Sequence, residues 1–179
     1  MYPGLHRSSL ASVLSIYRET LGWTVGYVIA DGVPGFPPDE QTITPLIDAT
    51  LFEFEGRQGP VIAANCACFD AVSMPSPVGQ ALLTAGEGGP HVPALVDREA
   101  SRVVLLVEPG SGSALASNDE RMHLHAGLRS WITVPPSPGL RWDTPPWIQA
   151  SRQPAPLPCG QDLVVTLHKV QRVLKRSGV

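Results

Sequence analysis

The stretch NCACFDAVSMPSPVGQALL, residues 65–83, runs from a buried strand into the start of a helix. Its first part completes an apolar run, 61–72, of small and β-branched residues, and this pattern is typical of an interior strand. Ser76 followed by Pro77 predicts a helix start, because proline fits the first helical turn, where no backbone donor is needed. We expect this helix to end at Gly86.

The segments on both sides of this stretch alternate between strand and helix patterns. Apolar residues at helical spacing predict a first helix that ends at Gly22 and a last helix at about 162–176. We read 111–118 as a polar loop, and 135–147 as too rich in proline for a helix or a strand ladder. The β-branched and aromatic segments predict further strands at 23–30, 94–96, 102–107 and 129–134. The predicted fold class is α/β (α+β), with a mixed or antiparallel sheet flanked by helices.

The predicted last helix separates its apolar residues from its basic ones. One stripe is apolar, and the other positions carry His168, Lys169, Arg172, Lys175 and Arg176. We interpret the positive charges near the end of this helix as a complement to the helix dipole rather than as a nucleic-acid site.

The composition limits the class of protein. With 179 residues, 43% of them hydrophobic, we expect a single domain over 1–179. A net charge of −3 argues against binding to nucleic acid or acidic membranes through the field of the whole molecule. We expect no membrane contact, because no apolar run is long enough to span a bilayer, and three cysteines without a disulfide framework fit the cytoplasm. The excess of arginine over lysine is typical of bacterial proteins encoded by GC-rich DNA.

Three segments occur in the order of motifs known from one protein family. They are CFDAVSMPSPVGQALL (68–83), VVLLVEPG (103–110) and RSWITVPPSPGLRW (129–142). Over 61–147 the chain resembles the bifunctional DNA primase/polymerase (prim-pol) domain of the archaeo-eukaryotic primase superfamily. The resemblance implies a prim-pol-like fold with an RRM-like core. Motifs of other nucleotide-binding, hydrolase and zinc-finger classes are absent from the sequence.

The resemblance also implies where catalytic residues would stand. Active members use an acidic pair, a third acid and a histidine to support nucleotidyl transfer with two divalent ions. Asp70, near the end of the predicted strand, matches the first acid, but Val72 stands at the second. The histidine position falls on Val103 or Val104, and the third acid falls near His123. One carboxylate cannot hold two divalent ions, so the resemblance implies a degenerate active site in which Asp70 alone remains, and we expect no cofactor.

Cysteine and histidine side chains offer a second, weaker possibility. Cys66, Cys68 and Asp70 alternate along one strand, so we expect them to share a sheet face, with Asp70 on the same side as Cys68. His123 and His125 alternate in the same way along a second possible strand. Two cysteines and two histidines suit Zn²⁺, although ligands at alternate positions of a flat strand make a poor tetrahedron. We therefore expect these side chains to pack rather than to bind a metal.

Arginine and tryptophan side chains near the proline-rich segment indicate a binding surface. The candidate residues for binding nucleic acid or a nucleotide are Arg102, Arg129, Ser137, Arg141 and Trp142. The alternative is that this proline-rich loop only packs against the edge of the domain.

These observations favour a non-enzymatic binding or regulatory module for nucleic acid, a nucleotide or a protein partner. Two alternatives stay open. The first is an active DNA primase/polymerase that uses Mg²⁺ or Mn²⁺ with substituted ligands such as Glu99, Glu108, Asp119 or Glu120. The second is a pure protein-interaction module, which the negative net charge favours.

Overall fold

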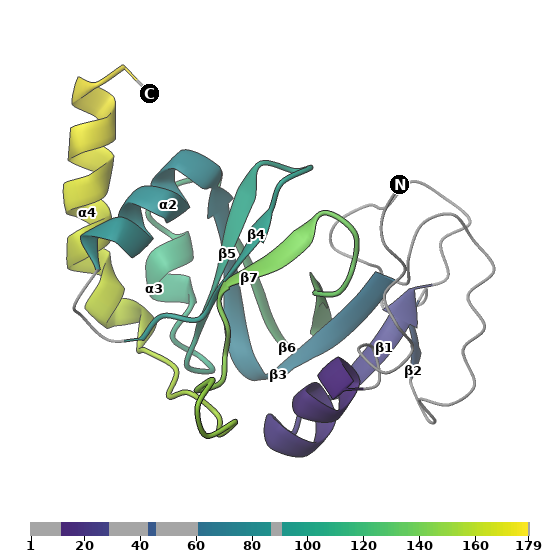
Figure 1. Ribbon diagram of the computed structural model, residues 1–179. Helices are drawn as coiled ribbons and strands as arrows, with labels where there is room; N and C mark the ends of the chain where they lie inside the picture. Colours follow the sequence, from purple (N-terminus) through teal and green to yellow (C-terminus); the bar gives the residue numbers. More distant parts are fainter. Residues whose placement is uncertain (1–11, 29–42, 46–60, 87–90, 179) are drawn as a thin grey trace.

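The computed structural model describes residues 12–28, 43–45, 61–86 and 91–178 (Figure 1). They form a mixed α/β fold in which helices flank a curled sheet with antiparallel pairing between its strands, as the sequence predicts (Figure 1). The strands are β1 (Val25–Val28), β2 (Ile43–Pro45), β3 (Val61–Pro75), β4 (Ala94–Asp97), β5 (Arg102–Val107), β6 (His123–Val134) and β7 (Leu140–Thr144). The helical elements are η1 (Ile16–Thr20), α2 (Ser76–Ala85), α3 (Ser113–Ala116) and α4 (Gly160–Arg176).

Strand β3 lies at the centre of the sheet. The strand order is β2-β1-β3-β5-β4-β7, and β6 pairs with the opposite edge of β3. The N-terminal half of β3 pairs with β1, and its C-terminal half pairs with β5. The predicted central position of the strand that carries Asp70 is therefore confirmed.

A bulge interrupts the ladder between β3 and β6. Cys66 is opposite Gly127, but the next paired residue of β3 is Ala71, opposite His125. The Asn65 side chain stabilises this irregular region, because its Nδ2 donates to the Leu128 carbonyl at 2.7 Å. Gly127 has a φ of 78°, a conformation that glycine adopts without strain. The bulge changes which residues of β3 point to each face of the sheet.

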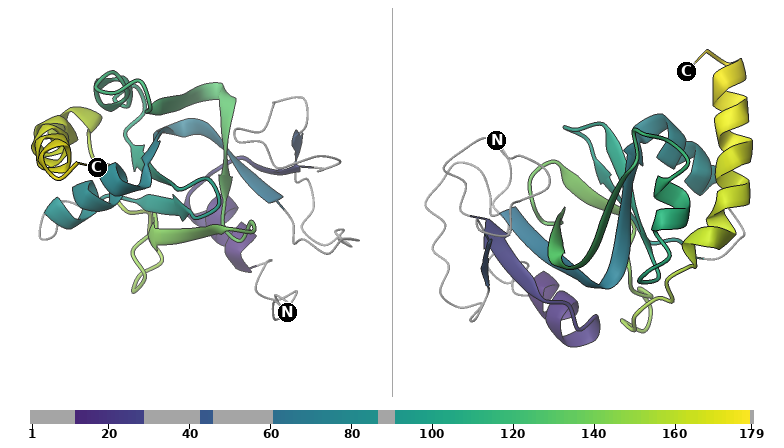
Figure 2. Two further views of the ribbon diagram at one scale, coloured as in Figure 1. Left: turned by 90° about the horizontal axis from the view of Figure 1, so that it is seen from above. Right: turned by 180° about the vertical axis from the view of Figure 1, so that it is seen from behind.

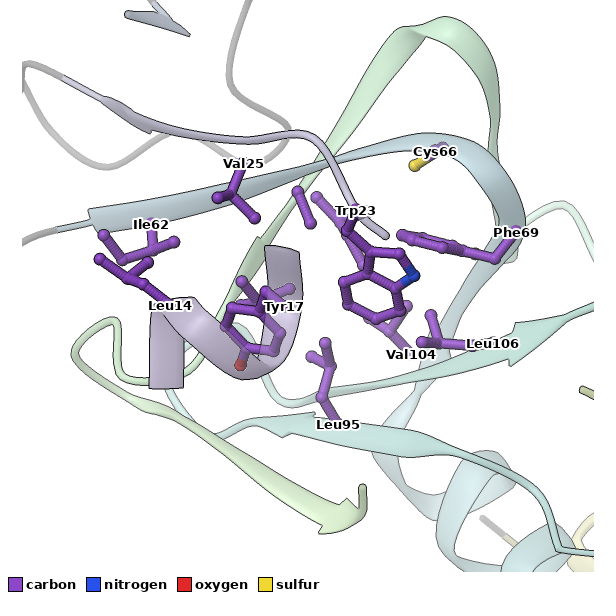
Figure 3. Close-up of a cluster of buried hydrophobic side chains, with 14 residues drawn as sticks. Leu14, Tyr17, Trp23, Val25, Ile62, Cys66, Phe69, Leu95, Val104 and Leu106 are labelled. Carbon is purple, nitrogen blue, oxygen red and sulfur yellow. The ribbon is translucent and has the colours of Figure 1, made fainter. Parts of the chain in front are cut away.

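One face of the sheet buries aromatic side chains, and we call it the aromatic face. Trp23 lies between Tyr17 and Phe69, with ring-centroid distances of 5.6 Å and 4.6 Å respectively (Figure 3). The Tyr17 hydroxyl donates to the Pro135 carbonyl and accepts a hydrogen bond from Trp142 Nε1 at 2.9 Å. These contacts attach η1 and β7 to the same core.

The other face, which we call the helical face, packs against α2 and α3, and α4 packs against these two helices. Figure 2 shows these three helices on one side of the sheet and η1 on the other. The buried side chains of this layer include Val72, Val103, Leu105, Leu115 and Leu167. No helix in the described part of the chain is long and apolar enough to cross a membrane.

Several predicted elements are confirmed, and others differ in extent. Helix α2 and the hairpin of β4 and β5 lie where the sequence predicts them, and α4 begins at Gly160. The prediction that 135–147 is too rich in proline for a strand ladder is wrong, because the five residues LRWDT between its prolines form β7 and pair with β4. The segment 111–118 contains the short helix α3, and β6 begins at His123 rather than near 129. The start of the first predicted helix and residues 29–30 of the predicted strand lie outside the described residues.

Candidate functional site

Asp70 is buried on the helical face and has a backbone partner. The residue is 3% exposed, and its Oδ2 accepts a hydrogen bond from the Gly112 N–H at 2.9 Å. Gly112 directly precedes α3, so the carboxylate attaches the start of this helix to the middle of the sheet. The prediction that Asp70 lies near the end of its strand is wrong, because β3 continues to Pro75.

The prediction that Cys66, Cys68 and Asp70 share one face is also wrong. Cys66 is buried in the aromatic cluster, Cys68 is exposed, and Asp70 points to the helical face. The cause is the bulge that follows Cys66, which shifts the alternation of side chains along β3.

The positions that correspond to the catalytic residues in the prim-pol motifs are divided between the two faces of the sheet. Val72 and Val103 are buried in the helical layer with Asp70, whereas Val104 is buried in the aromatic cluster. His123 pairs with Ser73, so it lies on the aromatic face. Asp70 and His123 therefore point to opposite sides of the sheet.

A group of polar side chains lies instead at one end of the aromatic face. We call it the Arg102 cluster, and it consists of Ser73, Arg102, His123 and His125. Arg102 Nε donates to the Ser73 hydroxyl at 2.6 Å, and Nη2 donates to the Ser73 carbonyl at 2.9 Å. Nη2 also donates to the Arg121 carbonyl at 2.7 Å. These bonds fix one edge of the guanidinium against β3.

The electrostatics of the Arg102 cluster suit an anion. Partial burial lowers the pKa of Arg102, and Asp97, its neighbour on β4, opposes this shift. The guanidinium is still a cation at neutral pH. Burial also lowers the pKa of His125, and the positive charges of His123 and Arg102 lower it further. An anion bound beside these groups would relieve this repulsion and favour protonation of His125.

The cysteine side chains give little support to a metal site. Burial and, to a smaller extent, the nearby charge of Asp70 raise the pKa of the Cys66 thiol to about 12. Metals bind the thiolate, which this environment disfavours. Within the ranges that the structure describes, no group of three or more His, Cys, Asp or Glu side chains is arranged to hold a metal ion.

The five residues predicted to bind nucleic acid or a nucleotide do not form one site. Ser137 is buried, where its hydroxyl accepts from the Ile62 N–H at 2.7 Å and donates to the Val134 carbonyl at 2.6 Å. Trp142 packs against Tyr17 in the aromatic core. Both side chains stabilise the fold, and neither is placed as the prediction requires.

The three predicted arginines lie in three different places. Arg102 belongs to the cluster described above, and Arg129 is exposed near the irregular part of β6. Arg141 is exposed, 3.9 Å from Asp143, and lines a cleft of about 740 Å³ between α2, α4, β4 and β7. The sequence reading missed Ser73 as a partner of Arg102 because the pairing of β3 with β5 brings them together across 29 residues.

Comparison of the chain with protein-family models, with curated proteins and with solved structures finds no match. Function therefore has to be inferred from the chemistry of the Arg102 cluster and of the remaining surface.

Proposed function

We propose that this chain is a non-enzymatic binding module with a prim-pol-like, RRM-like sheet, which binds the phosphate groups of a nucleotide through Arg102, His123 and His125. The nucleotide is either free or at the end of a nucleic-acid strand. The observation that carries the proposal is the guanidinium of Arg102, held by Ser73 beside two histidines.

The free edge of this guanidinium supports phosphate as the ligand. Nε and Nη2 are engaged by Ser73 and Arg121. Within the described residues, Nη1 has no hydrogen-bond partner, so its two N–H groups are available. A preorganised guanidinium binds phosphate oxygens with strong charge-assisted bonds and loses little side-chain entropy. His123 is exposed next to it and adds a third donor group.

The surroundings of Asp70 support the non-enzymatic part of the proposal. A catalytic carboxylate must reach its metal ions, but Asp70 is buried and bonded to Gly112. The neighbouring position of the family's acidic pair is the core residue Val72. Three free cysteines fit the reducing cytoplasm, which we keep as the proposed location.

A nucleotide titration tests the binding. Fluorescently labelled ATP or dATP is added to the wild-type chain and to Arg102→Gln, His123→Ala and Arg98→Gln. We expect Arg102→Gln to weaken binding by about tenfold or more, because a charge-assisted hydrogen bond is lost. Arg98 is exposed in the turn after β4, so its substitution is the control for loss of one positive charge. Within the described residues the His123 side chain makes no hydrogen bond, so weaker binding by His123→Ala cannot be attributed to unfolding.

Two results would reject the proposal. The first is nucleotide binding that is absent at millimolar concentration or equal in all four proteins, which would favour a pure protein-interaction module. The second is primer extension with Mg²⁺ or Mn²⁺ by the wild-type chain that Asp70→Ala abolishes. That result would establish an active primase/polymerase with substituted metal ligands.

A further inference from the structure

We propose, in place of the helix-dipole interpretation made from the sequence, that the exposed side of α4 binds the sugar-phosphate backbone of nucleic acid without sequence preference. We call this surface the basic face, and it consists of Lys169, Arg172, Lys175 and Arg176. It is separate from the Arg102 cluster, so the inference goes beyond the proposed function.

The distribution of charge along the chain supports this inference. The whole chain has 13 Lys and Arg against 16 Asp and Glu. Four of these cations stand on α4, whose only acidic residue is Asp162 in the first turn. The rest of the chain therefore has nine Lys and Arg against fifteen Asp and Glu. The chain outside α4 thus has a formal charge of −6, whereas α4 is basic, and a local basic surface of this kind is what a polyanion requires.

The geometry of α4 directs these charges to solvent. Lys169, Arg172 and Arg176 are spaced i, i+3 and i+7, so they form one line along the helix. The buried side chains Leu163, Leu167 and Val170 occupy the opposite side, where α4 packs against α2 and α3. Figure 1 shows α4 along the outside of the molecule, with its C-terminal end extending beyond α2. Nucleic acid can therefore approach this line of cations from solvent.

Repulsion within the basic face indicates that it has a purpose other than stability. Arg172 is three residues from Lys169 and Lys175 and four from Arg176, and like charges at these spacings destabilise a helix. Neither of the two ion pairs in the described part of the chain involves α4, although the hydrogen bond from Arg121 and, to a smaller extent, the charge of Lys175 lower the pKa of Asp119. The helix dipole favours cations only in the last turn, which explains Lys175 and Arg176 but not Lys169 or Arg172.

The side chains between the cations favour nucleic acid over a membrane. Helices that lie in a membrane surface insert Trp, Phe or Leu beside their basic residues. The exposed apolar residues of α4 are only Val165 and Val173. The length of the basic line also suits a nucleic-acid strand. Lys169 and Arg176 are about 10 Å apart along the helix axis, at 1.5 Å per residue. Successive phosphates of one strand are about 3.4 Å apart along the duplex axis, so the line spans about three of these steps.

Fluorescence anisotropy with a 20-base-pair DNA duplex lacking terminal phosphates tests the inference. The wild-type chain is compared with Arg172→Gln/Arg176→Gln, with Arg18→Gln/Arg98→Gln and with Arg102→Gln. The second pair removes the same charge from two other exposed positions. We expect at least tenfold weaker binding for the α4 variant and less than twofold for the control. In a plot of the logarithm of the binding constant against the logarithm of the salt concentration, the slope for the α4 variant should be less negative by about 2. The reason is that the variant makes two fewer phosphate contacts.

Each alternative outcome decides against this surface. Equal binding by the α4 variant and the wild-type chain overturns the inference, as does duplex binding that only Arg102→Gln abolishes. Absence of duplex binding at 20 mM salt overturns it as well. Capture of the chain by phosphatidylserine vesicles, with no binding to DNA, would identify a membrane surface instead. Binding of labelled ATP is measured on the same proteins, so failure of the α4 surface is distinguishable from failure of the Arg102 cluster.

Discussion

The Asp70 carboxylate accepts a hydrogen bond from the Gly112 backbone N–H, although the two residues are 42 positions apart in the sequence. Both residues are buried, and Leu124 packs beside them. A Cβ on Gly112 would lie 2.6 Å from the Leu124 side chain and 2.8 Å from the Asp70 Cβ. The absence of a side chain at Gly112 therefore allows the backbone to approach the carboxylate.

Asp70 is expected to contribute to stability and not to ligand binding. Asp70→Ala should lower the free energy of unfolding by about 2–3 kcal/mol, because it removes a buried hydrogen bond to a charged group and leaves the Gly112 N–H without a partner. Urea denaturation at pH 7 measures the change, with Asp162→Ala on the exposed side of α4 as the control. Loss of nucleotide affinity at unchanged stability would show that Asp70 belongs to a binding site.

Gly112→Ala tests the same contact from the other side. The added methyl group overlaps Leu124 and Asp70, so we expect a loss of about 1–3 kcal/mol in unfolding free energy. Gly86→Ala is the matched control, because its φ of −89° suits alanine and the nearest atoms to an added Cβ are 3.4 Å away. Equal stability of the two variants would mean that the loop before α3 moves away from Asp70 at little cost.

The three cysteines should differ in their reaction with a thiol reagent at pH 8. Cys68 is exposed and Cys159 is half-buried, whereas Cys66 is buried with its pKa raised to about 12. Because the thiolate is the reactive form, Cys66 should react only after the chain unfolds. The reaction is followed with Ellman's reagent in native and in denatured samples. Comparison with Cys66→Ala identifies the signal of the Cys66 thiol. Fast reaction of Cys66 in the native chain would contradict its place in the aromatic core.

His125 should make stability depend on pH. Its pKa is lowered in the folded chain, so the unfolded chain binds more protons once the pH falls below about 6.5, the ordinary value for histidine. The free energy of unfolding therefore decreases as the pH falls below that value and levels off below the folded pKa. Urea denaturation between pH 5 and pH 8 should show a smaller decrease for His125→Gln than for the wild-type chain. His91→Gln replaces a second, exposed histidine and serves as the comparison.

The sequence predicted the elements with strong local patterns and missed what depends on pairing across the sheet. The apolar stripe of α4 and the start of α2 at Ser76 depend on residues close in sequence, and both predictions are confirmed. The bulge after Cys66 depends on β6, which has its own irregularity near Leu128, and no local pattern in β3 reveals it. The contact of Ser73 with Arg102 likewise follows from the register of two strands.

Repulsion on the basic face of α4 can be measured without any ligand. Arg172→Glu replaces like-charge pairs with opposite-charge pairs to Lys169, Lys175 and Arg176. Each pair loses a repulsion of about 0.2–0.5 kcal/mol and gains an attraction of similar size, so for three pairs we expect the unfolding free energy at low salt to rise by about 1–3 kcal/mol. Since 1 M NaCl reduces the screening length to about 3 Å, the difference should disappear there. Arg98→Glu is the control, because its neighbours Asp97 and Glu99 are acidic and the same charge change should not stabilise the chain. A variant that is no more stable than the wild-type chain at low salt would mean that the four cations are too far apart in solution to repel one another.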